Sequence, residues 1–267
     1  MARANRHYIP GCVWHITHRC HKQEFLFKFA KDRSRYLYWL FEAKKRFGLK
    51  ILNYIVTSNH VHLLLFDTGQ DVIPKSIQLA AGRTAQEYNQ RKNRKGAFWE
   101  DRYHATAIDI EDHLYRCIIY IDLNMVRTGK IMHPGQWEAS GYNEIQNPPD
   151  RYTILDRKLL MRLCQVSDSK QMSVIHQQWI TDALDADISK KRDAVWSESV
   201  AVGGELFLEA INEKRKGFNK RKKIRNGSKL NLSEPTEPYN HSFDGKKDTL
   251  SQKNTYLWDE NYEFSDR

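Results

Sequence analysis

Residues 51–66 read ILNYIVTSNHVHLLLF, two apolar runs that meet at the polar residues Ser58 and Asn59. The first run covers residues 51–57 and the second covers residues 60–66, and both are rich in the aliphatic and β-branched residues that favour strands. A short polar turn between two such runs is typical of an antiparallel hairpin. The stretch therefore predicts two paired strands within an antiparallel sheet.

The segments on either side of this hairpin alternate between strand and helix. The first helix has apolar residues at helical spacing and ends at Gly48, a residue type that favours helix C-termini. The sequence predicts, in order, a strand over 12–20, a helix over 31–47, the two hairpin strands, a helix over 73–91, a strand over 105–110 and a helix over 111–127. This β-α-β-β-α-β order with one further helix is the ferredoxin-like pattern, an α+β fold with a four-stranded antiparallel sheet and helices on one face. Because the pattern carries many functions, it does not identify an activity.

Three regions are expected along the chain. Residues 1–150 form the predicted sheet domain, which ends at a stretch containing Pro148, Pro149 and Asp150. Residues 151–213 are expected to form a helical extension without a motif of known chemistry. Residues 214–267 are expected to be a mostly disordered basic tail, because they contain few of the large aliphatic residues that burial needs.

Composition limits the class of protein. Apolar residues make up 40% of the chain, which is enough for a sizeable core. No apolar run is long enough to span a bilayer, and the first residues lack the apolar stretch of a secretory signal, so we expect a cytoplasmic protein without a membrane partner. The four cysteines form no CxxC pair, which indicates reduced thiols rather than a disulfide framework or a zinc ribbon.

Positive charge is concentrated in two parts of the chain. Residues 1–150 contain 22 basic and 15 acidic residues, whereas residues 214–229 contain nine basic residues and no acidic one. An anionic polymer such as a nucleic acid is the natural partner of this distribution. A lysine-rich surface that contacts only solvent is the alternative, and charge alone does not decide between them.

The pair His60 and His62 is the first candidate for chemistry. The two histidines are two residues apart on a predicted strand, so both imidazoles emerge on one face and Val61 emerges on the other. That arrangement can chelate a metal ion. Two separate histidines in hydrogen-bonded core or surface positions are the alternative that the pair alone leaves open.

The second candidate is the predicted helix CIIYIDLNMVRTG. Tyr120 and Asn124 are four residues apart there and therefore lie on one helix face. If this face packs over the sheet near the histidines, it brings a phenol and an amide oxygen to them. An aromatic residue within the apolar stripe of a core helix is the ordinary alternative for Tyr120.

Five separated stretches together resemble one family. They are residues 6–19 (RHYIPGCVWHITHR), 53–65 (NYIVTSNHVHLLL), 82–108 (GRTAQEYNQRKNRKGAFWEDRYHATAI), 120–131 (YIDLNMVRTGKI) and 137–142 (WEASGY). In this order, over roughly residues 3–145, they resemble the REP-associated tyrosine transposases and their single-tyrosine insertion-sequence relatives, which carry the HUH histidine motif. The family commonly has Asn-Pro-Val where this chain has Asn124, Met125 and Val126, and loss of a proline within a helix removes no chemical group.

The resemblance implies an activity and assigns residues to it. It implies a transposase, a single-strand DNA endonuclease that cleaves and rejoins DNA at hairpin sequences through a 5′-phosphotyrosine. Tyr120 is then the nucleophile, His60 and His62 are metal ligands, and Asn124 is the third ligand of Mg²⁺ or Mn²⁺. Residues 1–150 would be the catalytic domain, and the protein would associate with the nucleoid when bound to DNA.

Single-stranded or hairpin DNA is the expected partner, and several basic residues are candidates for phosphate contacts. They are Arg3, Arg6, His7, Arg83, Arg91, Lys92, Arg94, Lys95 and Arg102. Ordinary surface charge is the alternative for each of them. Trp99 and Tyr103 are candidates for base stacking, although sheet packing is the more ordinary role of aromatic residues at strand spacing.

Three other classes of protein share some of these features. A ferredoxin-like RNA-binding module carries aromatic and basic residues on its central strands, where this chain has His60 and His62. A catalytically silent DNA- or RNA-binding regulator would have lost Tyr120 or a histidine, and none is lost. A zinc hydrolase would need a third histidine or a carboxylate at a usual spacing. The sequence leaves open the DNA target, the role of residues 151–213, and whether the protein is a monomer or a homodimer.

Overall fold

The hairpin predicted from the sequence is present as strands β2 (Lys50–Val56) and β3 (His60–Phe66), which pair antiparallel. Strand β1 (Val13–Arg19) pairs antiparallel with β3 on one side and with β4 (His104–Ile108) on the other. The order β2-β3-β1-β4 is that of the ferredoxin-like pattern. The predicted fold class is therefore confirmed.

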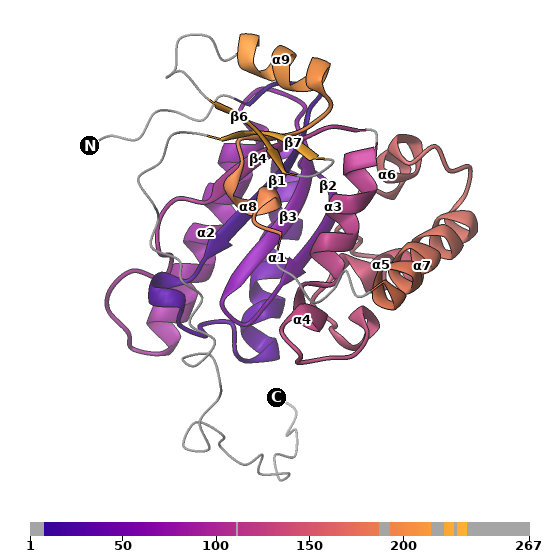
Figure 1. Ribbon diagram of the computed structural model, residues 1–267. Coiled ribbons are helices and arrows are strands. Elements are labelled where there is room, and N and C mark those ends of the chain that lie inside the picture. Colours follow the sequence, from indigo (N-terminus) through magenta and orange to yellow (C-terminus); the bar gives the residue numbers. More distant parts are fainter. Residues whose placement is uncertain (1–7, 111, 187–192, 215–221, 227–228, 234–267) are drawn as a thin grey trace. The chain divides into compact units, whose positions relative to one another are not determined.

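These elements are seen in a computed structural model (Figure 1). It describes residues 8–110, 112–186, 193–214, 222–226 and 229–233. By their contacts, these described residues form one compact unit. Among the described residues, no helix combines the length and the apolar character needed to cross a membrane.

One face of the sheet is covered by α1 (Ala30–Phe47) and α2 (Val72–Arg91), which pack against each other. The indole of Trp99 stacks on His18 of β1 at a centroid distance of 3.9 Å and donates a hydrogen bond to the carbonyl of Ala81 in α2. Since side chains alternate along a strand, Trp14 and Ile16 share this face with His18. This side therefore holds the part of the apolar core that lies between the sheet and these two helices.

The other face of the sheet is covered by α3 (Asp112–Asp122) and carries several buried polar side chains. His15 and Thr17 of β1 point to this side, and Thr17 stands opposite His62 of β3 in the strand register. The ring of His15 lies 5.9 Å from the ring of Tyr120 in α3. A row of buried polar side chains on a sheet requires hydrogen-bond partners, and those partners form the candidate site.

The helix predicted over 111–127 is divided into α3 and the short α4 (Asn124–Arg127). The division is slight, because the amide of Leu123 still donates to the carbonyl of Ile119 and the amide of Arg127 to the carbonyl of Leu123. These i to i−4 bonds keep the helical repeat across the junction. Tyr120 and Asn124 therefore remain on one face, as the spacing predicts.

Shorter elements connect and extend this frame. The α1 helix ends at Gly48, whose φ of 73° and amide bond to the carbonyl of Lys44 form the expected C-terminal cap. The remaining helices are the 3₁₀ turns η1 (His21–Gln23) and η2 (Pro134–Gln136), followed by α5 (Gly141–Gln146), α6 (Arg157–Leu163), α7 (Ser169–Asp185), α8 (Val195–Glu198) and α9 (Glu205–Lys214).

The segment expected to be a helical extension over 151–213 also contains a strand, β5 (Ala201–Gly203), so that expectation was incomplete. This strand pairs parallel with β4, and the amide of Ala107 donates to the carbonyl of Val200. A run of three apolar residues is too short to show a strand period in the sequence. It becomes a strand because the open edge of β4 offers unpaired backbone groups.

Eleven residues of the segment 214–267, which was expected to be mostly disordered, belong to regular elements: Lys214 ends α9, and the other ten form two strands. Strands β6 (Lys222–Asn226) and β7 (Lys229–Ser233) pair antiparallel, and β7 pairs with β5. They extend the sheet to the order β2-β3-β1-β4-β5-β7-β6. Ladder bonds join backbone groups, so a charged composition does not prevent them. Residues 234–267 lie outside the described part of the chain.

Candidate active site

Strand β3 places His60 and His62 together on the polar face of the sheet. Their rings are 4.9 Å apart and nearly perpendicular. The Nδ1 atom of His60 lies 3.0 Å from the hydroxyl of Thr57 and 2.7 Å from the side-chain oxygen of Asn59, in the turn that precedes the strand. His60 is thus held by local sequence, as expected for a residue at the end of a hairpin.

The α3 and α4 helices bring the other two predicted residues to the same place. The ring of Tyr120 lies 5.8 Å from the ring of His62, at 88° to it. The side-chain nitrogen of Asn124 lies 3.1 Å from Nε2 of His62. The structure therefore brings together His60, His62, Tyr120 and Asn124, which the sequence had only placed on two separate elements.

His62 has a second set of contacts through its other ring nitrogen. Its Nδ1 atom lies 2.8 Å from Nε2 of His15 and 3.3 Å from the hydroxyl of Thr17. The Nδ1 atom of His15 lies 2.6 Å from the carbonyl oxygen of Trp196, in α8. The two-residue spacing of His15 and Thr17 could have placed both on one strand face. Nothing in the sequence indicated that Trp196 would contact them.

Burial determines the ionisation of these two imidazoles. His15 is fully buried, which lowers its pKa to about 4 even though the carbonyl of Trp196 acts in the opposite direction. Burial also lowers the pKa of His62 well below its ordinary value, and neighbouring positive charge, first that of His60, adds to the effect. Both rings are therefore neutral at pH 7, and a neutral imidazole has a lone pair for a metal ion.

Arg127 places positive charge beside the phenol. Its guanidinium carbon lies 4.5 Å from the centroid of the Tyr120 ring, and its Nη2 atom donates to the carbonyl oxygen of Tyr120 at 3.0 Å. A planar guanidinium at this position can bind a phosphate that approaches Tyr120. Arg127 was not among the predicted site residues, although its seven-residue spacing from Tyr120, two helical turns, places it on the same face.

The amide of Asn124 has an unused acceptor. Its oxygen is buried and has no hydrogen-bond partner, while its nitrogen faces Nε2 of His62. A half-turn of the amide exchanges these two atoms, so that the oxygen of Asn124 faces Nε2 of His62 instead. An oxygen and two imidazole nitrogens are suitable ligands for a divalent ion. Among the described residues, no cluster of three or more His, Cys, Asp or Glu has the geometry of a metal site, so an ion here would depend on the amide.

The predicted DNA-binding residues on α2 and the loop after it do not join this site. Arg91 pairs with Asp32, and Arg94 pairs with Glu24 at 3.2 Å. The guanidinium of Arg83 lies 5.5 Å from the ring of Trp39, and Lys92 stands over the ring of Phe29. Lys95 and Arg102 are exposed. Arg3, Arg6 and His7 lie outside the described residues.

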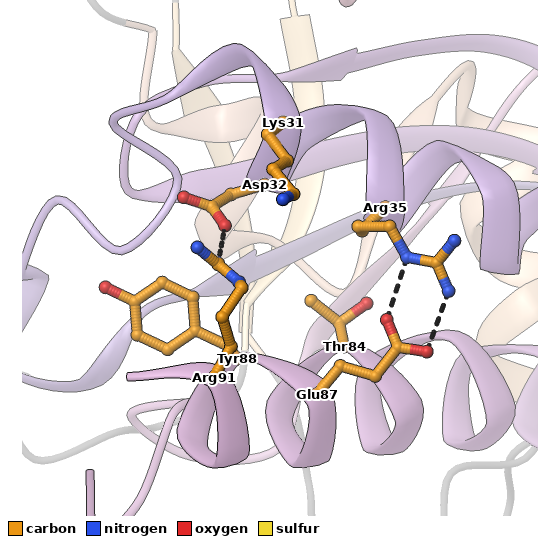
Figure 2. Close-up of a pocket in the computed structure, with 7 residues that line it drawn as sticks. All are labelled: Lys31, Asp32, Arg35, Thr84, Glu87, Tyr88 and Arg91. Atoms are coloured by element: carbon orange, nitrogen blue, oxygen red, sulfur yellow. Dashed lines mark hydrogen bonds and ion pairs between the residues drawn. The ribbon is translucent and has the colours of Figure 1, made fainter. Parts of the chain in front are cut away.

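A small pocket separates α1 from α2 on that side of the sheet (Figure 2). Its volume is about 140 Å³, and two ion pairs cross it, Arg35 with Glu87 and Arg91 with Asp32. Because each of these guanidinium groups already faces a carboxylate, a DNA phosphate would have to compete with that carboxylate. The pocket therefore gives no support to the assignment of Arg91.

The two aromatic residues proposed for base stacking differ in their surroundings. Trp99 stacks on His18 and bonds to the backbone of α2, so its ring is used within the fold. The ring of Tyr103 lies 6.0 Å from that of His18 and is partly exposed. Trp99 therefore packs within the fold, which is the ordinary alternative to base stacking.

A known protein family matches the part of the chain that contains most of these residues. Residues 8–123 match the family model of the IS200-like transposases. This confirms the family resemblance of the sequence and supports a transposase role. The match spans β1 to the first residue after α3, and therefore includes His60, His62 and Tyr120.

Two solved structures are also similar to the chain. A REP-associated tyrosine transposase bound to a REP hairpin is 18% identical, with a TM-score of 0.46, and the match covers 58% of this chain and 90% of that one. A candidate transposase from Deinococcus radiodurans R1 is 17% identical, with a TM-score of 0.33, and the match covers 48% of this chain and 97% of that one. No curated protein matches the chain.

Proposed function

We propose that this protein is a metal-dependent tyrosine endonuclease and strand transferase that acts on single-stranded DNA at hairpin sequences. The observation that carries the proposal is the convergence of Tyr120 and Asn124, from one helix face, on the histidine pair of β3. A phenol beside two imidazoles and an amide is the set of groups that phosphoryl transfer to tyrosine needs.

His60, His62 and Asn124 are the residues that would hold a divalent ion, Mg²⁺ or Mn²⁺. The neutral imidazole of His62 and the unpartnered amide oxygen of Asn124 suit such an ion. When bound, it would supply positive charge that neutralises a non-bridging oxygen of the scissile phosphate. Arg127 would add a second positive charge on the side of the phenol.

Tyr120 would act as the nucleophile. Its phenolic oxygen forms a bond to phosphorus while the bond from phosphorus to the 3′ oxygen breaks, and the proton lost by the phenol is balanced by the one gained at the 3′-hydroxyl. The product is a 5′-phosphotyrosine and a free 3′ end. Because the phosphodiester energy is kept in the protein link, the reverse reaction joins strands without ATP, and a transposase uses this property.

The site must open to admit DNA. Only 6% of the Tyr120 surface is exposed, and its ring lies 6.2 Å from the buried ring of Trp196. A phosphate cannot reach the phenol unless neighbouring side chains move. A splayed single strand or a hairpin end presents its phosphates more freely than a regular duplex, which is consistent with the proposed substrate.

The substitution Tyr120→Phe tests the proposal, because it removes only the phenolic oxygen. We expect this variant to bind a hairpin-bearing single strand but to form neither cleaved product nor covalent adduct in the presence of Mn²⁺. Tyr115→Phe is the matched control, since the ring of Tyr115 packs on that of Trp179 in α7. Adduct formation by Tyr120→Phe together with its loss in Tyr115→Phe would move the nucleophile to Tyr115.

A further inference from the structure

A line of hydrogen bonds connects the candidate metal ligand His62 to the C-terminal part of the chain. It runs from Nδ1 of His62 to Nε2 of His15 at 2.8 Å, and from Nδ1 of His15 to the carbonyl oxygen of Trp196 at 2.6 Å. The rings of His15 and His62 are nearly parallel, with centroids 5.0 Å apart. The line joins β3, β1 and α8, three elements that are distant in sequence.

The carbonyl oxygen of Trp196, at the end of this line, determines which nitrogen atoms carry hydrogens. A carbonyl oxygen only accepts, so Nδ1 of His15 must carry a hydrogen. If Nε2 of His15 also carried one, His15 would be a fully buried imidazolium, and no carboxylate contacts it among the described residues. Nε2 of His15 is therefore the acceptor, and Nδ1 of His62 is the donor. The lone pair of His62 is then on Nε2, the atom that faces Asn124.

His60 reaches the same tautomer by a different route. The hydroxyl of Thr57 donates its hydrogen to the backbone carbonyl of His60 at 2.8 Å, so toward Nδ1 of the His60 ring it can only accept. The Nδ1 atom of His60 therefore carries a hydrogen, so that whenever this ring is neutral its lone pair is on Nε2. A local turn thus fixes one histidine, whereas the other depends on His15 and a distant carbonyl.

We propose that His15 is a positioning residue, which together with the carbonyl of Trp196 fixes His62 in the Nδ1–H tautomer and so directs its Nε2 lone pair to Asn124. The proposal rests on the proposed function in one respect, that His62 is a metal ligand. Without this acceptor, a neutral His62 can also carry its hydrogen on Nε2, and that tautomer cannot bind a metal through Nε2. The C-terminal segment, to which the sequence assigned no role, would thus help to organise the metal site.

Two substitutions of His15 separate this role from simple packing. His15→Phe keeps a planar ring but removes both ring nitrogens, whereas His15→Gln keeps an amide oxygen that can accept from Nδ1 of His62. Thr17→Val is the comparison variant, because the Thr17 hydroxyl is the other acceptor near Nδ1 of His62, at the longer distance of 3.3 Å. Circular dichroism tests whether each variant is folded.

The first measurement is the tautomer of His62 in the metal-free protein, read from two-bond ¹⁵N–¹H correlation spectra of ¹⁵N-histidine-labelled samples. We expect the hydrogen on Nδ1 in the unmodified protein, in Thr17→Val and in His15→Gln, and a mixture in His15→Phe. The second measurement is Mn²⁺ affinity by titration, which we expect His15→Phe to weaken about 10- to 100-fold, with partial recovery in His15→Gln.

A hydrogen on Nε2 of His62 in the unmodified protein would overturn the proposal. An unchanged tautomer and unchanged Mn²⁺ affinity in folded His15→Phe would overturn it as well. If His15→Phe does not fold, the spectrum of the unmodified protein and the comparison of His15→Gln with Thr17→Val still decide. A protein with the expected tautomer and Mn²⁺ binding but without DNA cleavage would contradict the proposed function and leave the role of His15 intact.

Discussion

The Nε2 atom of His176 lies 2.8 Å from Oδ2 of Asp122, and both side chains are fully buried. His176 belongs to α7, whereas Asp122 ends the helix that carries Tyr120 two residues earlier. The other carboxylate oxygen of Asp122 accepts from the amide of Asn53 in β2 at 3.0 Å. The helix with the proposed nucleophile is therefore attached both to the sheet and to the segment after residue 150.

Substitution of His176 should loosen this attachment. In His176→Ala the Asp122 carboxylate loses one buried partner, and we expect the free energy of unfolding to fall by about 3 kcal/mol, measured by urea denaturation. The exposed neighbour Gln177→Ala is the control and should change stability by less than about 0.5 kcal/mol. Equal stability of the two variants would show that the pair does not hold α7 on α3.

The metal ligands should differ in importance. We expect His60→Ala and His62→Ala to abolish cleavage at all Mn²⁺ concentrations, because each loses an imidazole nitrogen that binds and orients the ion. Asn124→Ala should need more Mn²⁺ and recover only part of the activity at saturation, since water can replace a neutral amide oxygen. A titration of cleavage rate against Mn²⁺ measures this, and full activity of the unmodified protein in EDTA would contradict the metal proposal.

Asn124→Asp provides a sharper version of the same test. The substitution keeps the size of the side chain and replaces the neutral ligand with a charged oxygen, so Mn²⁺ should bind more tightly than in the unmodified protein. Equal Mn²⁺ affinity of Asn124→Asp, Asn124→Ala and the unmodified protein would remove Asn124 from the ligand set.

The basic run, residues 214–221, should contribute to DNA affinity without base specificity. Residues 214–221 contain five basic residues, of which only Lys214 lies within the described chain. Replacing all five by glutamine should flatten the dependence of log affinity on log salt by roughly 0.7 for each single-strand phosphate that the variant no longer neutralises. The substitution leaves β6 and β7 intact, because β6 begins at Lys222.

A matched control for this experiment lies in the segment after residue 150. Four basic residues there, Arg151, Lys158, Arg162 and Lys170, are exposed and can be replaced by glutamine in the same way. We expect the salt slope of this control to stay near that of the unmodified protein. A slope that changes equally in both variants would mean that charge acts through the whole field of the protein rather than through direct binding by the basic run.

Glu144 should make stability depend on pH. Burial raises the pKa of its carboxyl above the ordinary value, although the amide of Leu155 donates to it and acts in the opposite direction. Since the folded protein binds this proton more tightly than the unfolded chain, the stabilisation is present below about pH 4.5 and is lost as pH rises through the folded pKa. Glu144→Gln is uncharged at every pH and lacks this loss.

We therefore expect the stability of Glu144→Gln relative to the unmodified protein to increase as the pH rises from about 4.5 toward neutrality. Urea denaturation of both proteins across this range measures the difference, which changes by at most about 1.4 kcal/mol per pH unit for one group. A stability difference between the two proteins that stays constant with pH would show that burial does not raise the pKa of the Glu144 carboxyl.

The sequence alone determined the parts of this protein that depend on local periodicity. The alternation of His60 and His62 about Val61, and the four-residue spacing of Tyr120 and Asn124, each specify one face of one element whatever surrounds it. The order of strands and helices over residues 12–127 predicted the ferredoxin-like sheet for the same reason. The observed ends of these strands and helices differ little from the predicted ones, and the helical repeat continues even across the junction at Leu123.

Only the tertiary structure decided which residues meet those faces. The contact of His15 with Trp196 joins residues 181 positions apart, and β5 is a strand only because the edge of β4 has free backbone groups beside it. Such contacts depend on the packing of distant segments, which no local spacing records. The tautomer of His62, and with it the direction of its lone pair, is therefore a property of the folded chain and not of the motif.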